Sequence, residues 1–106
     1  GLGDVYKRQD LGTALEELCA QRPPVLGQGA TLIILSDSKT IDQNRAVRAV
    51  LEAKRQAGRV IWLNPVPENK WQYLRSIQTM AALVPMVSCS TLRELAAACR
   101  KLAGGQ

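Results

Sequence analysis

The sequence predicts an α/β fold with a mostly parallel sheet, and two observations lead to this prediction. The run Thr31–Leu35 is almost entirely apolar and ends in the polar segment 36–40, which is typical of a central strand buried on both faces. A helical pattern and a second apolar run, Val60–Leu63, follow it, and strand, helix and strand in this order form a βαβ unit. We therefore expect half of a doubly wound sheet.

Helical patterns precede and follow the first strand. Residues 11–19 place apolar side chains at helical spacing, and Pro23 would stop the helix. Asp10 can cap its amino end, with Thr13 and Glu16 as an alternative capping pair. A second helix is expected over about residues 42–57, and Gly58 would take the left-handed conformation that often ends a helix. The expected buried face of this second helix consists of Ala46, Val47, Val50, Leu51, Ala53 and Ala57.

The last third of the chain continues the alternation. A short helix is expected around residues 71–81, and a short strand over 84–87, which Pro85 would confine to the edge of the sheet. Thr91 and Glu94 have the spacing of a capping box, which predicts a final helix that begins beside them and ends at Gly104-Gly105. Its predicted apolar stripe is Leu92, Leu95, Ala96, Cys99 and Leu102.

The charged and aromatic residues do not indicate nucleic-acid binding. The net charge of +5 comes from 14 basic and 9 acidic residues that are scattered among one another, as on an ordinary solvated surface. For the aromatic residues Trp62, Trp71 and Tyr73, packing in or around the core is expected rather than stacking on bases. One stripe of the second helix is expected to face solvent, namely Arg45, Arg48, Glu52 and Arg55.

The chain contains no histidine and three cysteines. The lack of histidine excludes Ser-His-Asp and Cys-His catalysis and zinc sites with imidazole ligands within this sequence. Cys19, Cys89 and Cys99 match neither a C-x-x-C motif nor a zinc spacing, so we expect small buried thiols in a reducing, cytoplasmic environment. No apolar run approaches the ~20 residues that a membrane-spanning helix needs.

Asp37 is the candidate functional residue. It is the first charged residue beyond the carboxyl end of the strand at about 30–36, and ligands of open α/β sheets bind at such ends. A carboxylate at this position can ligate a hard cation such as Mg²⁺, or it can stabilise a turn or cap the next helix. From the residues, both interpretations stay open.

Four segments of the sequence resemble a known family. DLGTAL, TLIILSDS, RVIWLNPVPENKW and STLRELAAACRKL resemble the carboxyl-terminal half of a von Willebrand factor A (VWA) domain, closest to its CoxE-like bacterial branch. The resemblance covers residues 10–103 and implies a three-layer α/β/α Rossmann-like fold whose amino-terminal half is truncated. Residues 1–9 resemble a translated sequencing-adapter tail, so we interpret them as non-native and 10–104 as part of a single VWA-like domain.

The resemblance also implies a metal site. VWA domains of this kind hold a divalent cation, usually Mg²⁺, in a metal-ion-dependent adhesion site (MIDAS) supplied by an Asp-x-Ser-x-Ser loop, a threonine and an aspartate. The resemblance assigns Asp37 to the aspartate position. The Asp-x-Ser-x-Ser segment is absent, Gln9 stands at the threonine position, and Ser38 replaces the usual glycine. We therefore expect Mg²⁺ binding by the full-length parent protein and none by this chain.

The resemblance implies a protein–protein interaction module, not an enzyme, that acts with a MoxR-type AAA+ ATPase in metalloenzyme maturation. The alternative is a flavodoxin-like or receiver-type phosphotransfer domain, or a Mg²⁺-dependent enzyme domain, that uses Asp37. The sequence lacks the further acidic pair of receiver domains and the glycine motifs that bind nucleotide phosphates. Loss of the first strand would leave strand 30–36 as an open edge, through which we expect self-association.

Overall fold

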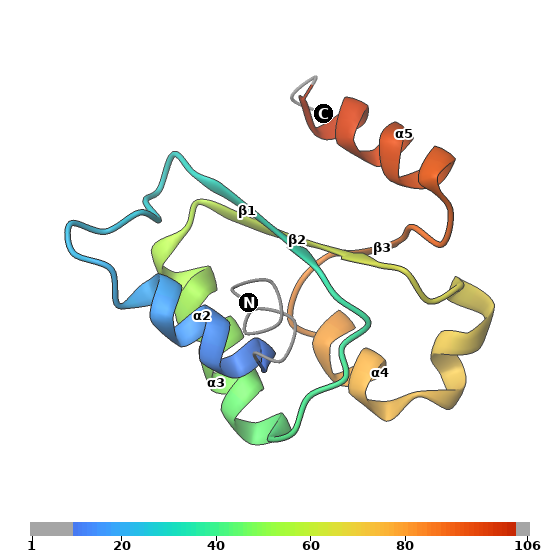
Figure 1. Cartoon of the computed structure of the whole chain (residues 1–106), viewed down its shortest axis with the longest axis horizontal. Coiled ribbons are helices and arrows are strands. Elements are labelled where there is room, and N and C mark those ends of the chain that lie inside the picture. The colour runs from blue at the N-terminus through green and yellow to red at the C-terminus, as the bar shows by residue number, and fades with distance from the viewer. Residues whose placement is uncertain (1–9, 104–106) are drawn as a thin grey trace, which may run out of the picture. The chain divides into compact units, whose positions relative to one another are not determined.

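The computed structural model describes residues 10–103, so the proposed non-native tail 1–9 and the expected helix end at Gly104 lie outside the described residues. The elements are α2 (Leu11–Cys19), β1 (Thr31–Leu35), α3 (Gln43–Gln56), β2 (Arg59–Asn64), the 3₁₀-helix η1 (Glu68–Tyr73), α4 (Arg75–Ala81), β3 (Met86–Ser88) and α5 (Leu92–Ala103) (Figure 1). This alternation confirms the predicted α/β class. None of the described helices has the length and apolarity that crossing a bilayer requires.

The described strands form one sheet in the order β1-β2-β3. β2 and β3 are parallel, with Leu63 opposite Val87. β3 lies at an edge, as predicted, and it begins after Pro85 because proline has no N–H to donate to a neighbouring strand. The Pro85 carbonyl instead accepts the backbone N–H of Trp62 at 2.9 Å.

The chain divides into two compact units, and β1 and β2 contribute residues to both. Among the described residues, the first unit contains 10–32 and 39–60, and the second contains 33–38 and 61–103.

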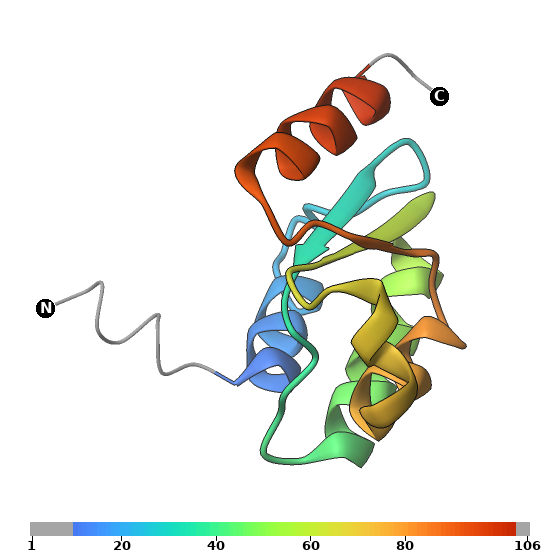
Figure 2. The ribbon, with the colours of Figure 1, turned by 90° about the vertical axis from the view of Figure 1, so that its right-hand side faces the viewer.

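In the first unit, α2 and α3 lie side by side (Figures 1 and 2). Gly12 allows a close approach, because a Cβ at this position would lie 3.4 Å from the Cα of Ala46. The predicted face of α3 needs correction at three positions: Leu51 is 46% exposed, Val47 is only half-buried, and Ala49 is buried although it was not predicted. A helix repeats every 3.6 residues, so the buried positions follow the i, i+3, i+4, i+7 pattern. They are Ala46, Ala49, Val50 and Ala53.

The prediction for Gly58 was wrong. α3 ends at Gln56 and Ala57 is extended, while Gly58 does not adopt a positive φ. Glycine is needed here for another reason, since a Cβ would lie 1.7 Å from the carbonyl oxygen of Gln28. The Gly58 N–H also donates to the carbonyl of Ala30 at 3.1 Å. The loop before β1 therefore lies directly on the backbone that leads into β2.

In the second unit, Trp62, Ile77 and Met80 are fully buried. The helix predicted over 71–81 is in fact two elements, η1 and α4, because Leu74 between them is extended. An extended residue stops the hydrogen-bond ladder, so the two segments cannot form one helix.

α5 packs against one face of the sheet in the second unit. Leu95 and Ala98 contact a buried cluster formed by Ile61, Leu63 and Cys89. The predicted stripe was wrong at Cys99, and likewise at Ala96, because both are exposed. The side of α5 that packs on the sheet is the one that carries Leu95 and Ala98, because these side chains contact Ile61 and Leu63 of β2.

The predicted capping box at α5 forms with one change. The Glu94 N–H donates to the hydroxyl of Thr91 at 3.1 Å, as the box requires. The Glu94 carboxylate accepts from the N–H and the hydroxyl of Ser90, each at 2.8 Å, instead of from Thr91. These bonds lower the pKa of Glu94.

β1 is not buried on both faces, which corrects the prediction from its apolar sequence. Ile34 is buried, whereas Ile33 is 43% and Leu35 is 60% exposed. Alternate residues of a strand point to opposite faces, so the two exposed side chains share one face. β1 is an edge strand, and α5 covers Ile61 and Leu63 on β2, so this face of β1 stays open in the second unit.

Candidate functional site

Asp37 lies in the polar segment that follows β1, between two residues whose positions are fixed. The Ser36 carbonyl accepts the indole N–H of Trp62 at 2.8 Å, and the Ser36 N–H donates to the carbonyl of Leu63 at 3.2 Å. The Ser38 N–H donates to the Ser36 hydroxyl at 3.1 Å. Asp37 itself is half-buried. These hydrogen bonds hold the backbone in place on both sides of the Asp37 carboxylate.

Ser38 takes the left-handed conformation, with φ 72°, and is fully buried. A residue with a Cβ is strained in this region, which explains why glycine suits the position. The Ser38 hydroxyl accepts the side-chain amide N–H of Asn64 at 3.3 Å. Asn64 in turn accepts the N–H of Val66 at 2.9 Å through Oδ1, so it closes the turn after β2. Asn64 thereby joins the loops that follow β1 and β2.

Ser38 allows a direct test of this strain. Ser38→Ala keeps the positive φ and loses the acceptor for Asn64, whereas Ser38→Gly loses the same acceptor but removes the strain. We expect the alanine variant to be less stable than the glycine variant by about 1 kcal/mol. Urea denaturation of both variants measures this difference, and an alanine variant as stable as the glycine variant would contradict a left-handed Ser38.

A second polar cluster lies in the first unit, around Asp10. Its carboxylate caps α2 by accepting the N–H of Gly12 at 3.1 Å, as predicted. It also accepts the hydroxyl of Thr40 at 2.7 Å and the N–H of Ile41 at 2.9 Å, which sequence analysis missed. The hydrogen bond from Thr40, followed by that from Ile41, holds the pKa of Asp10 below its ordinary value. A polar side chain thirty residues downstream of a cap gives no local signal that the two will meet.

We expect Asp10→Asn to destabilise the protein by about 1 kcal/mol at pH 7, because a neutral amide is the weaker acceptor. A carboxyl group whose pKa is lowered by folding contributes stability above its unfolded pKa, near 3.8, and loses it as the pH falls through the folded value. As the pH falls from 5 to 2, the Asp10→Asn variant should therefore lose less of its free energy of unfolding than the wild type loses, as denaturant titrations can measure.

Asp42→Asn is the matched control, since Asp42 caps α3 through the single N–H of Arg45. Equal losses of stability at pH 7 in the Asp10→Asn and Asp42→Asn variants would contradict the added role of Asp10.

The described residues do not fit a complete metal site. Within 10–103, no group of three or more His, Cys, Asp or Glu side chains could hold a metal ion. Beside Asp37, the Ser36 hydroxyl already accepts the Ser38 N–H, and the Ser38 hydroxyl accepts the side-chain amide of Asn64 from the end of β2. Mg²⁺ prefers octahedral oxygen coordination with one or two carboxylates and several waters. Asp37 could supply one such ligand, but within residues 10–103 it belongs to no group of three or more His, Cys, Asp or Glu side chains that could hold an ion.

The charged stripe of α3 is largely paired, as expected for a solvated helix face. Arg45 forms a bidentate ion pair with Glu16 of α2, at 2.9 and 2.6 Å. Arg55 pairs with Glu52 in its own helix. Each pairing lowers the pKa of its glutamate and raises that of its arginine. Both pairs are exposed, so they contribute little to stability.

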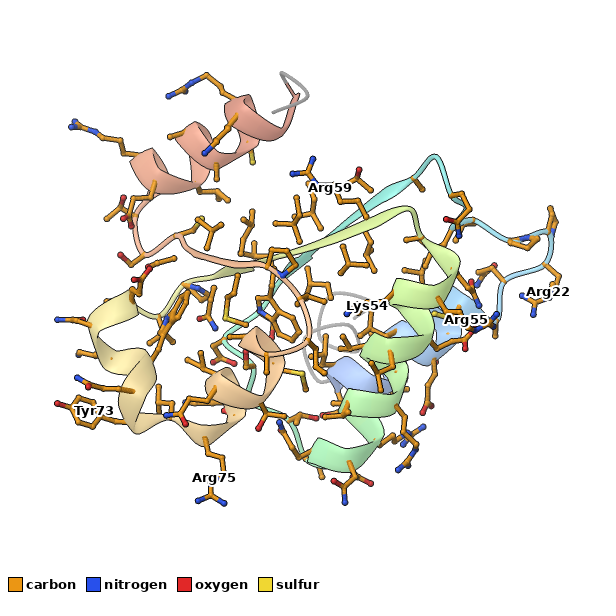
Figure 3. The ribbon with its side chains drawn as sticks, turned by 180° about the vertical axis from the view of Figure 1, so that it is seen from behind. Arg22, Lys54, Arg55, Arg59, Tyr73 and Arg75 are labelled. Carbon is orange, nitrogen blue, oxygen red and sulfur yellow. The ribbon has the colours of Figure 1, made fainter. Side chains whose placement is uncertain are left out.

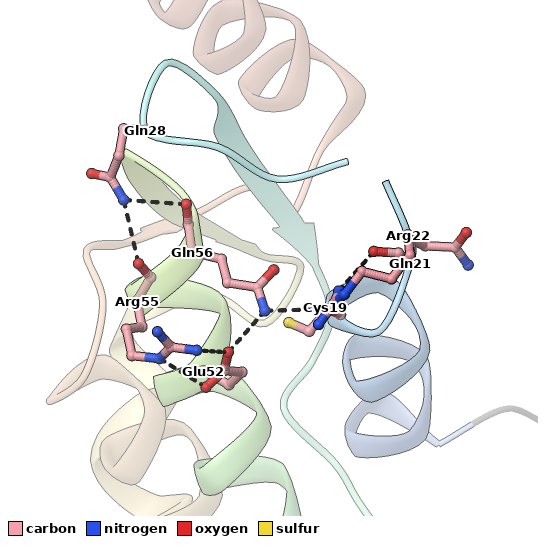
Figure 4. A network of polar contacts seen from close by, with 7 residues as sticks. All are labelled: Cys19, Gln21, Arg22, Gln28, Glu52, Arg55 and Gln56. Carbon is pink, nitrogen blue, oxygen red and sulfur yellow. Dashed lines mark hydrogen bonds and ion pairs between the residues drawn. The ribbon is translucent and has the colours of Figure 1, made fainter. Parts of the chain in front are cut away.

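A network of polar contacts joins the carboxyl-terminal end of α3 to α2 and to the loop after it (Figure 4). The side-chain amide of Gln56 donates to the carbonyl of Cys19 at 3.1 Å and to Glu52 at 2.8 Å. Gln28 donates to the carbonyls of Arg55 and Gln56, each at 3.3 Å. Burial, with the Glu52 charge second, raises the pKa of the Cys19 thiol, as is typical of a buried structural cysteine. This network supports the packing of the two helices.

All three cysteines are free thiols. Cys19 and Cys89 are buried, as predicted, and burial raises the pKa of Cys89 as well. Cys99 is exposed, which corrects the prediction for this residue because α5 turns a different flank to the sheet.

A comparison with known protein families identified a match that covers most of this chain. The chain matches the family model described as "VWA domain containing CoxE-like protein" over residues 3–98. The searches of curated proteins and of solved structures found no match. The α/β architecture agrees with a VWA-like fold, and the match spans most of the sequence. The chain belongs to the CoxE-like family of proteins that contain a VWA domain.

Proposed function

We propose that this chain is part of a metal-dependent protein-binding module, in which Asp37 provides one carboxylate ligand to a Mg²⁺ ion in the full-length protein. The position of Asp37 carries the proposal: it lies two residues beyond the end of β1, and Ser36 and Ser38 on either side are held by hydrogen bonds. Metal ligands are effective when the surrounding structure holds them in place before the ion binds. We assign no other ligand to the described residues.

Membership of the CoxE-like family supports a role in protein interaction. We further propose that the partner is a MoxR-type AAA+ ATPase, that the pair acts in metalloenzyme maturation, and that the module itself does not catalyse a reaction. We place this action in the cytoplasm of a bacterium, because the three free cysteines suit a reducing compartment.

The experiment that tests the metal role uses the full-length protein and isothermal titration with Mg²⁺. We expect Asp37→Ala to weaken Mg²⁺ binding by at least about tenfold, since a lost ligand should cost no less than a lost outer-shell partner. Asp42→Ala is the control, because it removes a carboxylate that caps α3 a few residues further along the chain. Unchanged Mg²⁺ affinity in the Asp37 variant would overturn the proposal.

A specific observation favours a second role, self-association through β1. The strand lies at the edge of the sheet, carries no charge or proline, and exposes Ile33 and Leu35 on one face. Edges of this kind pair readily with another strand. Sedimentation velocity at increasing concentration should show dimers or larger species that Leu35→Lys shifts to monomer. A wild-type chain that stays monomeric at high concentration would exclude this role.

A further inference from the structure

The turn between η1 and α4 presents an exposed aromatic side chain. Tyr73 is 77% exposed, although packing was predicted for it, and Leu74 beside it is 37% exposed. Tyr73 and Arg75 both project away from the ribbon (Figure 3). Tyrosine combines a large apolar ring with a polar tip and is enriched where proteins meet. Its exposure beside a leucine and an arginine makes this turn a surface that a partner could contact.

Two cations accompany this tyrosine. Lys70 precedes Tyr73 by three residues, and side chains at this spacing in a 3₁₀-helix lie on the same side. Within the part of the chain that the structure describes, neither Lys70 nor Arg75 has an ion-pair partner. Arg45 and Arg55 on α3, by contrast, are both paired with glutamates. The cations around Tyr73 are thus available to an external carboxylate.

The backbone beneath these side chains is held firmly. The indole N–H of Trp71 donates to the carbonyl of Val66 at 2.8 Å, and the Leu74 N–H donates to the carbonyl of Trp71 at 3.0 Å. The side-chain amide of Gln78 donates to the carbonyls of Gln72, at 2.7 Å, and of Trp71, at 3.2 Å. Little ordering of the backbone is left to be done when a partner binds, which lowers one part of the entropy cost of binding.

We propose that Lys70, Tyr73, Leu74 and Arg75, the 70–75 surface, form a docking site for an acidic protein segment that carries apolar side chains. The two unpaired cations match carboxylates, and the rings and methyl groups of Tyr73 and Leu74 match apolar side chains. Two cations flanking apolar surface suit a protein segment better than a nucleic acid, which needs a longer array of phosphate contacts. The inference rests on the proposed protein-binding function and names the chemistry of the partner, but it requires no metal.

The test uses the full chain and a short fluorescein-labelled peptide of glutamate and leucine, followed by fluorescence anisotropy at low ionic strength with EDTA present. We expect saturable binding that weakens as salt is added. Tyr73→Ser and Arg75→Glu should each weaken binding by about tenfold, the effect of losing one important contact. Arg48→Glu is the matched control, because it changes the net charge equally at an exposed position of α3 and should alter affinity less than about twofold.

Three outcomes would overturn the inference. They are absence of saturable peptide binding, an equal loss in the Arg48 and Arg75 variants, and tighter binding of a single-stranded oligothymidine than of the peptide. The docking site and the proposed metal role can be tested independently of each other. Asp37→Ala should leave peptide binding in EDTA unchanged, whereas Arg75→Glu should leave the Mg²⁺ affinity of the full-length protein unchanged.

Discussion

Replacing Trp62 with alanine is expected to lower the free energy of unfolding by about 4 kcal/mol, the largest effect that we predict. Trp62 is fully buried, so the substitution removes a large apolar side chain and leaves a cavity. It also removes the indole N–H that the Ser36 carbonyl accepts at 2.8 Å. The variant should therefore both unfold more easily and release one of the bonds that fix the chain before Asp37.

Trp62→Phe separates these two contributions. Phenylalanine keeps most of the apolar volume but cannot donate to the Ser36 carbonyl, so we expect a loss of about 1–2 kcal/mol. Urea denaturation followed by far-ultraviolet circular dichroism measures both variants without depending on tryptophan fluorescence. An alanine variant no less stable than the phenylalanine variant would show that Trp62 is not central to the core.

The second large effect is expected at Gly58. Gly58→Ala should destabilise the protein by about 3 kcal/mol, because the new Cβ would lie 1.7 Å from the carbonyl oxygen of Gln28. This oxygen belongs to the backbone and cannot rotate away as the end of a side chain could. The shift that relieves the clash must also disturb the hydrogen bonds of the Gly58 N–H to the carbonyls of Gly27 and Ala30.

Gly29→Ala is the matched control for this prediction. A Cβ at Gly29 meets no atom within 4 Å, and the residue does not adopt a positive φ, so the change should stay within about 0.5 kcal/mol of the wild type. Thermal and urea denaturation of the two variants provide the comparison. Equal stabilities of the two variants would contradict the close approach of the loop to the start of β2.

The sequence predicted the features that depend on neighbouring residues. Asp10 as a cap, Thr91 and Glu94 as a capping box and Pro85 beside an edge strand were all identified, because each signal lies within a few residues of its effect. The family match agrees with the resemblance of the apolar strands and their flanking motifs. The metal-binding role of Asp37 stays a prediction.

Other features depend on segments that are distant in the chain. The composition of β1 predicts burial on both faces, yet Leu35 is exposed because α5 covers β2 instead. Gly58 was expected to end a helix, yet it is required by a carbonyl thirty residues earlier. Tyr73 was expected to pack, but it projects from a turn that forms where Leu74 interrupts the helix.

By itself, the sequence determined the α/β alternation, the caps at Asp10 and Thr91 and the family of the chain, because hydrophobic periodicity and turn chemistry act over a few residues. Only the tertiary structure decided which strand faces are covered, which glycine touches another backbone, and that Asp10 reaches Thr40. The physical reason is that burial and close contact belong to pairs of segments, and no single segment records where its partner will pack.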